Sequence, residues 1–98
     1  MAEHRFVVAG DVDLATGAEL QAKLMVLATV TTDDLVLDCA DLEFIDSIGI
    51  GVFVHIRQLL EAQDRRLRIE NMNDRVRRPF DVLGLTELFG IGTPEPAN

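Results

Sequence analysis

Short apolar runs and longer helical repeats alternate along the chain. Residues 5–9 and 35–40 are β-branched or leucine-rich runs typical of strands, and the second is apolar enough for a parallel strand buried on both faces. Between them, leucine and alanine recur with helical spacing over residues 14–30, which predicts an amphipathic helix. Asp13 stands where a helix N-cap is expected, and residues 31–34 break the pattern.

The second half of the chain repeats this order of elements. The pattern predicts a helix from Ser47 to about Gln63, a strand at 67–69, a helix capped by Asn73 or Asp74 that runs to Val82 before Gly84, and a turn with a short strand at 85–89. Strands that alternate with helices predict one α/β domain with βαβ crossovers and a mostly parallel, four-stranded sheet. We assign residues 1–92 to this domain and expect residues 93–98 to form a disordered tail.

The composition is that of one soluble globular domain. The chain has 98 residues, of which 48% are hydrophobic and 27% are charged. Its apolar stretches are too short to span a bilayer and its N-terminus lacks a signal-peptide pattern, so we expect a cytoplasmic protein without membrane contact. A single cysteine, Cys39, excludes an internal disulfide and lies in a run that is typical of a buried strand.

The net charge of −8 is concentrated in the first half of the chain. Residues 1–46 carry ten acidic residues against Arg5 and Lys23, whereas the acidic residues and arginines of residues 47–98 balance. An acidic surface argues against nucleic-acid binding, because neutralising phosphates requires basic groups. The charge either attracts a basic protein partner or only keeps the domain soluble.

Two predicted loops follow strands at the edge of a parallel sheet, where functional residues usually gather. They are residues 10–13 and residues 42–51. We expect residues 41–46 to form an irregular loop in which Leu42 and Phe44 point inward as apolar anchors.

Ser47 stands at the predicted start of the second long helix, where backbone N–H groups lack partners within the helix. Gly49 and Gly51 each cost roughly 1 kcal/mol of helix propensity relative to alanine. Close approach of another backbone is one reason to keep glycine there. Two interpretations remain open. In the first, either Asp46 or Ser47 is simply the helix N-cap and the glycines pack against the sheet. In the second, Ser47 is an exposed serine that becomes modified.

The sequence contains no complete catalytic or metal-binding signature, so we expect no enzyme, no metal site and no cofactor. A serine hydrolase built around Ser47 would need glycine at position 45 and a nearby base. Position 45 is Ile, and the two histidines, His4 and His55, are not placed as a base for Ser47. A P-loop would need Gly-Lys-Ser/Thr, but the single lysine is Lys23, and a dinucleotide-binding motif would need glycine where Val54 stands. Asp11 and Asp13 lack the further ligands of a calcium loop.

Two motifs, taken with their spacing, resemble one protein family. Residues 10–14 read Gly-Asp-Val-Asp-Leu, and residues 46–51 read Asp-Ser-Ile-Gly-Ile-Gly. They resemble the STAS domain of anti-sigma factor antagonists, in which Gly-x-hydrophobic-Asp precedes the first helix and Asp-Ser with two following glycines opens a later one. Residues 75–85 resemble the family's third helix and its Gly-Leu end. The likeness covers about residues 6–90 and implies a STAS-like fold.

In the family that the chain resembles, the serine after the aspartate is phosphorylated by an anti-sigma factor that is also a serine kinase using Mg-ATP. The resemblance implies that the unphosphorylated chain binds this kinase and frees a sigma factor, that phosphorylation of Ser47 ends binding, and that a phosphatase restores it. The nucleotide belongs to the kinase, so no cofactor is implied here. The implied partner surface consists of Asp11, Asp13, Asp46, Ser47, Ile48, Gly49, Ile50 and Gly51.

Three alternatives use the same residues: a STAS scaffold subunit of a transporter or stress-signalling complex, a small hydrolase, and an antagonist that binds constitutively. Two departures from the family pattern also matter. Ile48 replaces the usual Ser, Thr or Ala, and we expect it to narrow partner choice. Only five residues precede Phe6, where most members have a further strand. We therefore expect a missing or shortened N-terminal strand and an open sheet edge that could pair two copies into a homodimer.

Overall fold

The computed structural model describes residues 2–91 of the chain. Within this range the elements are β1 (Glu3–Val7), β2 (Gly10–Val12), α1 (Leu14–Val30), β3 (Asp34–Asp38), β4 (Leu42–Ile45), α2 (Ser47–Glu61), β5 (Leu67–Glu70) and α3 (Asp74–Val82). All strand pairs are parallel, which confirms the predicted α/β class with βαβ crossovers. The expected disordered tail lies outside the described residues.

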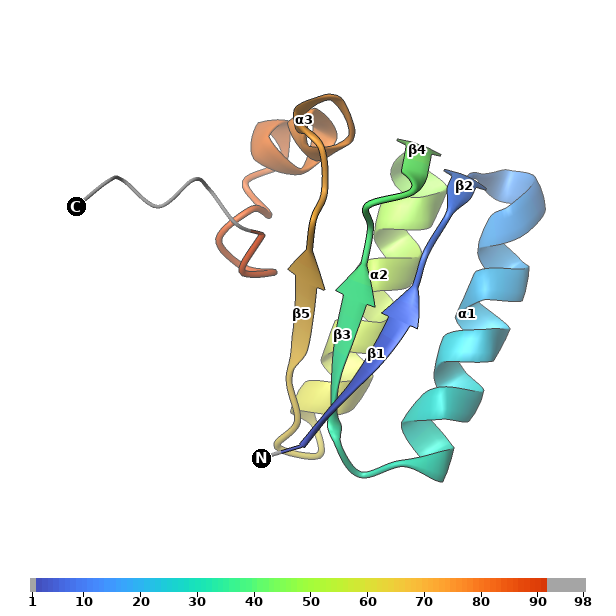
Figure 1. The fold of residues 1–98 in the computed structure, drawn as a ribbon, viewed down its shortest axis with the longest axis vertical. Helices are drawn as coiled ribbons and strands as arrows, with labels where there is room; N and C mark the ends of the chain where they lie inside the picture. Colours follow the sequence, from blue (N-terminus) through green and yellow to red (C-terminus); the bar gives the residue numbers. More distant parts are fainter. Residues whose placement is uncertain (1, 92–98) are drawn as a thin grey trace.

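The strands form a three-stranded sheet in the order β1-β3-β5 and a two-stranded sheet of β2 and β4, rather than one four-stranded sheet. The small sheet continues β1 and β3 beyond a short break, as Figure 1 shows. Helices α1 and α2 lie side by side against one face of the larger sheet, and α3 lies at the end where β4 finishes. Both edges of the larger sheet, β1 and β5, are unpaired within the described chain.

The core lies between the sheet and the two long helices. Alternate residues of the strands point toward the helices, because side chains of a strand alternate between faces. Their buried members are Leu35, Leu37, Cys39, Leu67 and Ile69, and they belong to the same buried cluster as Leu20, Leu24, Phe53, Ile56 and Leu60. Val36 lies on the opposite face between Arg5 and Arg68 in register and is also buried. The apolar strand is therefore covered on both faces, as its sequence predicts.

Three phenylalanines join the C-terminal part of the described chain to this core. Phe80 from α3 and Phe89 pack edge-to-face with ring centroids 5.8 Å apart, and both contact Phe53 of α2. The segment around Phe89 forms successive turns, so the short strand predicted at 85–89 is wrong. Burial of Phe89, rather than strand pairing, fixes this segment. Gly84, with φ of +72°, ends α3 at the position where the sequence predicts its end.

Residues 42–45 form β4, not the irregular loop that the sequence predicts. Leu42 pairs with Gly10 and Phe44 pairs with Asp11, so Glu43 is an extra residue on its strand. A bulge of this kind reverses the in-and-out alternation. Leu42 is therefore buried, whereas Phe44 is 50% exposed and is not the inward anchor that we expected.

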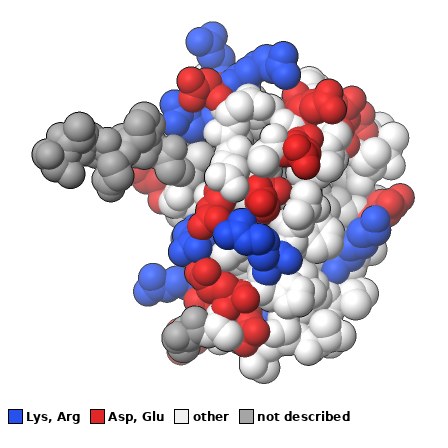
Figure 2. Space-filling model, viewed as in Figure 1, with Lys and Arg blue, Asp and Glu red and all other residues white. Residues whose placement is uncertain are grey.

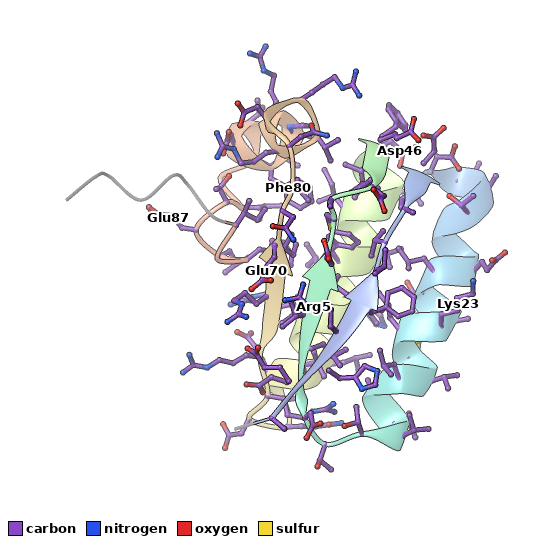
Figure 3. The ribbon with its side chains drawn as sticks, in the orientation of Figure 1. Arg5, Lys23, Asp46, Glu70, Phe80 and Glu87 are labelled. Carbon is purple, nitrogen blue, oxygen red and sulfur yellow. The ribbon has the colours of Figure 1, made fainter. Side chains whose placement is uncertain are left out.

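The face of the larger sheet that α1 and α2 do not cover carries alternating charges, visible near the middle of Figure 2. Arg5 Nη2 lies 2.6 Å from Glu70 Oε1, and its Nη1 lies 3.4 Å from Asp38 Oδ2 (Figure 3). Arg68 bonds Glu70 and Glu3. The hydrogen bond from Arg5 is the main reason that the pKa of Glu70 lies below its ordinary value. The pKa of Asp38 is lowered first by the Asn71 side chain and then by the Ala40 N–H.

Replacing Arg5 by glutamine should lower the melting temperature by a few degrees at pH 7 and by less at pH 3. A carboxylate with a lowered pKa stabilises the fold above its unfolded pKa, and this contribution is lost as pH falls through its folded pKa. The stabilisation from the Glu70 carboxylate therefore begins to fall below about pH 4.5, the ordinary pKa of Glu, and continues to fall as the pH passes through its lowered folded pKa. Circular dichroism melts at low salt test this, with Lys23→Gln as the control for one lost charge. Equal melting-temperature differences at both pH values would contradict it.

Arg65 is a buried cation at the end of the molecule where α1 and α2 finish. Its guanidinium donates to the Ala28 carbonyl at 2.8 Å and to the Asp33 carbonyl at 2.8 and 3.1 Å, and it also bonds the Gln63 side chain. These bonds satisfy carbonyls beyond and near the C-terminus of α1. This end of the domain is thus held together by polar contacts.

Cys39 is fully buried at the end of β3. Burial raises the pKa of its thiol to about 12, so the group stays protonated at neutral pH. Among residues 2–91, no helix has the length and hydropathy needed to cross a membrane.

Candidate functional site

The two predicted functional loops come together at one end of the molecule. Strands β2 and β4 lie side by side with Val12 opposite Ile45, and each strand is followed by an aspartate and a helix. The Asp46 N–H donates to the Val12 carbonyl oxygen at 3.2 Å and ties the two turns together. The starts of α1 and α2 therefore point toward the same surface, shown around Asp46 in Figure 3.

Asp46 is the N-cap of α2. Its Oδ1 accepts hydrogen bonds from the N–H groups of Ile48 at 2.9 Å and Gly49 at 3.0 Å. These are two of the donors that a helix start leaves without partners. Because Asp46 is the cap, Ser47 occupies the first helical position with its side chain exposed. Within residues 2–91 the Ser47 hydroxyl has no hydrogen-bond partner. Of the two interpretations left open, the capping role belongs to Asp46.

Asp13 plays the same part at α1. Its Oδ1 accepts from the Ala15 N–H at 2.9 Å and the Thr16 N–H at 3.2 Å, and the Thr16 hydroxyl accepts from the Asp13 N–H at 3.0 Å. This capping box confirms the predicted N-cap. The Thr16 hydroxyl also donates to the Asp11 carbonyl oxygen at 2.7 Å, which holds the preceding turn and leaves the Asp11 side chain exposed.

The two glycines of the Asp-Ser-Ile-Gly-Ile-Gly motif have different surroundings. A Cβ atom at Gly49 would lie 2.6 Å from Ile45 Cγ1 and 2.7 Å from both Cγ1 and the carbonyl oxygen of Val12. Gly49 is therefore the point at which α2 touches the backbone of β2. A Cβ atom at Gly51 would meet nothing within 4 Å, and Gly51 is exposed. Close approach of a backbone accounts for the first glycine and not for the second.

The surface around Ser47 carries exposed apolar groups beside acidic ones. Ile48 is 46% exposed, and one of its methyl groups lies close to Gly17 of α1. Leu14 and Phe44 are also exposed at this end of the molecule. Of the predicted partner-binding residues, Gly49 and Ile50 are buried, whereas Asp11, Ser47, Ile48 and Gly51 face solvent and Asp13 and Asp46 are half-buried.

Sequence reasoning missed a groove next to Ser47. We call it the α2–α3 groove, because it runs between the first turn of α2 and the outer face of α3. Ile45, Ile50, Pro79, Val82 and Leu83 give it an apolar lining, and Asp46, Ser47, Arg75 and Arg78 complete it. The helical spacing of 75, 78, 79 and 82 places these residues on one face of α3. That spacing was the available signal, but what α3 faces is set by tertiary packing.

The described residues do not form a metal site: no three His, Cys, Asp or Glu side chains lie close enough together to hold an ion. No base is hydrogen-bonded to the Ser47 hydroxyl in this part of the chain. His55 lies on α2, about two turns beyond Ser47, with its side chain exposed. The site thus offers an exposed hydroxyl at a helix start, without the hydrogen-bonded base of a serine nucleophile among residues 2–91.

Comparison with known proteins assigns the class. The family model described as the STAS domain matches residues 5–96, so the chain belongs to the STAS domain family. Proteins named anti-sigma-B factor antagonist are its relatives. The one from Bacillus subtilis is 34% identical over 84 residues, which cover 86% of this chain and 76% of that protein. The one from Staphylococcus epidermidis is 32% identical over 84 residues and 78% of its own length.

Solved structures agree with this assignment. The unphosphorylated form of the anti-sigma factor antagonist SpoIIAA matches with a TM-score of 0.78 and 25% identity, over 97% of this chain and 84% of that one. Its phosphorylated form matches with a TM-score of 0.69 and 24% identity, over 97% and 86% of the two chains. The murine Solute Carrier 26 family member A9 anion transporter has a TM-score of 0.76 at 16% identity, over 87% of this chain and 14% of that one, a likeness of fold alone.

Proposed function

We propose that this protein is an anti-sigma factor antagonist: in its unphosphorylated form it binds an anti-sigma factor serine kinase and so releases a sigma factor. Phosphorylation of Ser47 ends the binding, and a phosphatase restores it. The relatives named anti-sigma-B factor antagonist, similar over most of both chains, support this function. We place the protein in the bacterial cytoplasm, in keeping with the organisms of these relatives.

The exposed, unpartnered Ser47 hydroxyl is the observation that carries the proposal. Asp46 already accepts from the Ile48 and Gly49 N–H groups, so the Ser47 side chain is not needed to cap α2. A kinase can therefore reach Ser47 without opening the fold. In the transfer, the Ser47 oxygen bonds to the γ-phosphorus of Mg-ATP, the bond from that phosphorus to the bridging oxygen of ADP breaks, and the hydroxyl proton leaves to the kinase or solvent.

Phosphate at this position would act on the interface rather than on the fold. It adds about −1.5 to −2 charges at pH 7. A helix N-terminus favours an anion by roughly 0.3–1 kcal/mol, so the free domain accepts the phosphate. Burying such a group in a protein interface without matched partners costs several kcal/mol. The interface penalty is the larger effect, and phosphorylation should release the partner.

The proposed partner surface is acidic and apolar, with Asp11, Asp13 and Asp46 beside Ile48. A basic, partly apolar surface of the kinase would complement it. The chain supplies the serine and the kinase supplies the nucleotide, so we assign no catalytic step and no cofactor to this protein. Pairing of two copies along the open edge of β1 stays a prediction.

Incubation with the candidate kinase and Mg-ATP tests the proposal. Intact-mass spectrometry should show one added phosphate on the wild-type chain and none on Ser47→Ala. The free hydroxyl is absent from that variant, while the Asp46 cap remains. Peptide mapping should place the phosphate on Ser47. Phosphate on another residue, or none with the kinase that the unphosphorylated chain binds, would refute the proposed switch.

The transporter-scaffold alternative has weaker support. The anion transporter shares the fold, but at 16% identity and over a small part of that chain. The relatives named anti-sigma-B factor antagonist are about twice as similar in sequence and match along most of their length. This difference favours the antagonist.

A further inference from the structure

Helix α3 presents two cations to the surface that holds Ser47. Arg75 and Arg78 are one turn apart, and both line the α2–α3 groove together with Ser47. The opposite side of α3 buries Val76 and Phe80 in the core, which fixes the direction of the arginine face. Figure 2 shows basic side chains over α3 and acidic ones over the ends of β2 and β4, at the same end of the molecule.

These two arginines lack acidic partners in a chain rich in acid. The protein has 17 acidic and 9 basic residues. In the described part of the chain, four of the eight arginines bond a carboxylate, namely Arg5, Arg57, Arg68 and Arg77. Arg75 and Arg78 form no ion pair and no side-chain hydrogen bond within residues 2–91. In such a chain, two unpaired arginines that line the same groove as an exposed serine indicate an anion that is not always present.

We propose that Arg75 and Arg78 bind the phosphate of phosphorylated Ser47, so that the modified side chain folds over the α2–α3 groove and closes it. This inference rests on the proposed function, because it describes what the switch does once the phosphate is in place. It adds an intramolecular action of the phosphate to its direct effect on the interface.

The cap of α2 explains why the phosphate needs these arginines. A phosphate at a helix start would ordinarily accept hydrogen bonds from the first free N–H groups. Here Asp46 Oδ1 already accepts from Ile48 and Gly49. Asp11, Asp13 and Asp46, which lie at the same end of the molecule, repel an anion. Arginine offers paired N–H donors that match phosphate oxygens, and both Arg75 and Arg78 line the groove that Ser47 also lines.

Closing the groove would also hide apolar side chains of this chain that the partner could otherwise contact. Val82 is 78% exposed and Leu83 is 57% exposed in the unphosphorylated chain, and both line the groove. Exposed apolar side chains of this kind are typical of a protein-binding surface. A phosphate that draws Arg75 and Arg78 across the groove covers these apolar side chains. It also neutralises two cations that the partner could otherwise contact.

The proposal can be tested on the protein alone. Phosphoserine is placed at position 47 during translation by amber suppression, so neither kinase nor partner is needed. The second ionisation of the phosphate is then followed by ³¹P NMR against pH. Nearby guanidinium groups favour the dianion, so Arg75→Gln/Arg78→Gln should raise the titration midpoint by roughly one pH unit. Arg75→Lys/Arg78→Lys should bring the midpoint part of the way back to the wild-type value, because lysine keeps the positive charge but lacks the paired N–H donors of arginine.

Arg66→Gln is the matched control, because Arg66 is another exposed arginine without a side-chain ion pair in the described chain and does not line the groove. Melts of the unphosphorylated variants check that each is folded. The double glutamine variant should shift the titration midpoint by more than Arg66→Gln does. If the two shifts were equal, or if the double variant shifted less, the proposal would be overturned. A kinase that fails to modify Ser47 would refute the proposed function and leave this result unaffected.

Discussion

Aspartate at position 47 should weaken binding of the anti-sigma factor kinase by at least about 100-fold, equivalent to roughly 2.7 kcal/mol. The side chain would place a charge at the centre of the proposed docking surface, beside Asp46 and Asp13. An interface that buries this charge must desolvate it, which costs several kcal/mol unless the partner supplies a matched opposite charge. The fold itself should tolerate the change, because Asp is favourable in the first turn of a helix.

Isothermal titration calorimetry with the candidate kinase measures this effect, and a thermal melt checks the fold. Ser47→Asn is the matched control, since it has nearly the same size as aspartate without the charge. Ser47→Ala should bind like the wild type. The melting temperature of Ser47→Asp should not fall. If the aspartate and asparagine variants bound equally well, charge would not be the cause of the switch.

Alanine at Gly49 should destabilise the domain by about 2 kcal/mol, or lower its melting temperature by roughly 10 °C. The new methyl group would come within 2.7 Å of the Val12 carbonyl oxygen, which is backbone and cannot swing away. That oxygen also accepts the hydrogen bond from Asp46 that joins the two turns. The helix propensity of alanine offsets only part of this cost, roughly 1 kcal/mol.

Gly51→Ala provides the comparison within the same helix. Its methyl group meets nothing within 4 Å, so the variant should gain about 0.5–1 kcal/mol from helix propensity alone. Urea unfolding of both variants gives the two free energies. The expected signs are opposite, and a similar effect of both substitutions would show that α2 does not depend on the close contact with β2.

The sequence pattern predicts the longer elements correctly because each carries its own signal. Leucine spacing identifies α1, the apolar run identifies β3, and Asn73 with Gly84 brackets α3. Strands β2 and β4 escape prediction because each has three or four residues and is stabilised mainly by pairing with the other. The outward turn of Phe44 depends on a bulge, and a bulge depends on register with a strand distant in sequence.

The candidate site is predicted only in part for the same reason. Asp13, Asp46 and Ser47 belong to local motifs, so their positions at helix starts follow from the sequence. The meeting of the two motifs through Val12 and Asp46 requires the parallel pairing of β2 with β4. The α2–α3 groove is a contact between separate helices. In the sequence alone its arginines are typical of a solvated helix face, and only the structure shows that they line a groove with Ser47.

The buried, protonated Cys39 makes the protein convenient for fluorescence work. Thiol-directed dyes react with thiolates, so the native cysteine should remain unlabelled in the folded protein. Exposed Thr32 lies in the loop between α1 and β3. Figure 1 shows this loop at the end of the molecule opposite the start of α2, so a cysteine could be introduced there. A dye attached there would report tumbling of the free and partner-bound protein, with no need to remove the native thiol first.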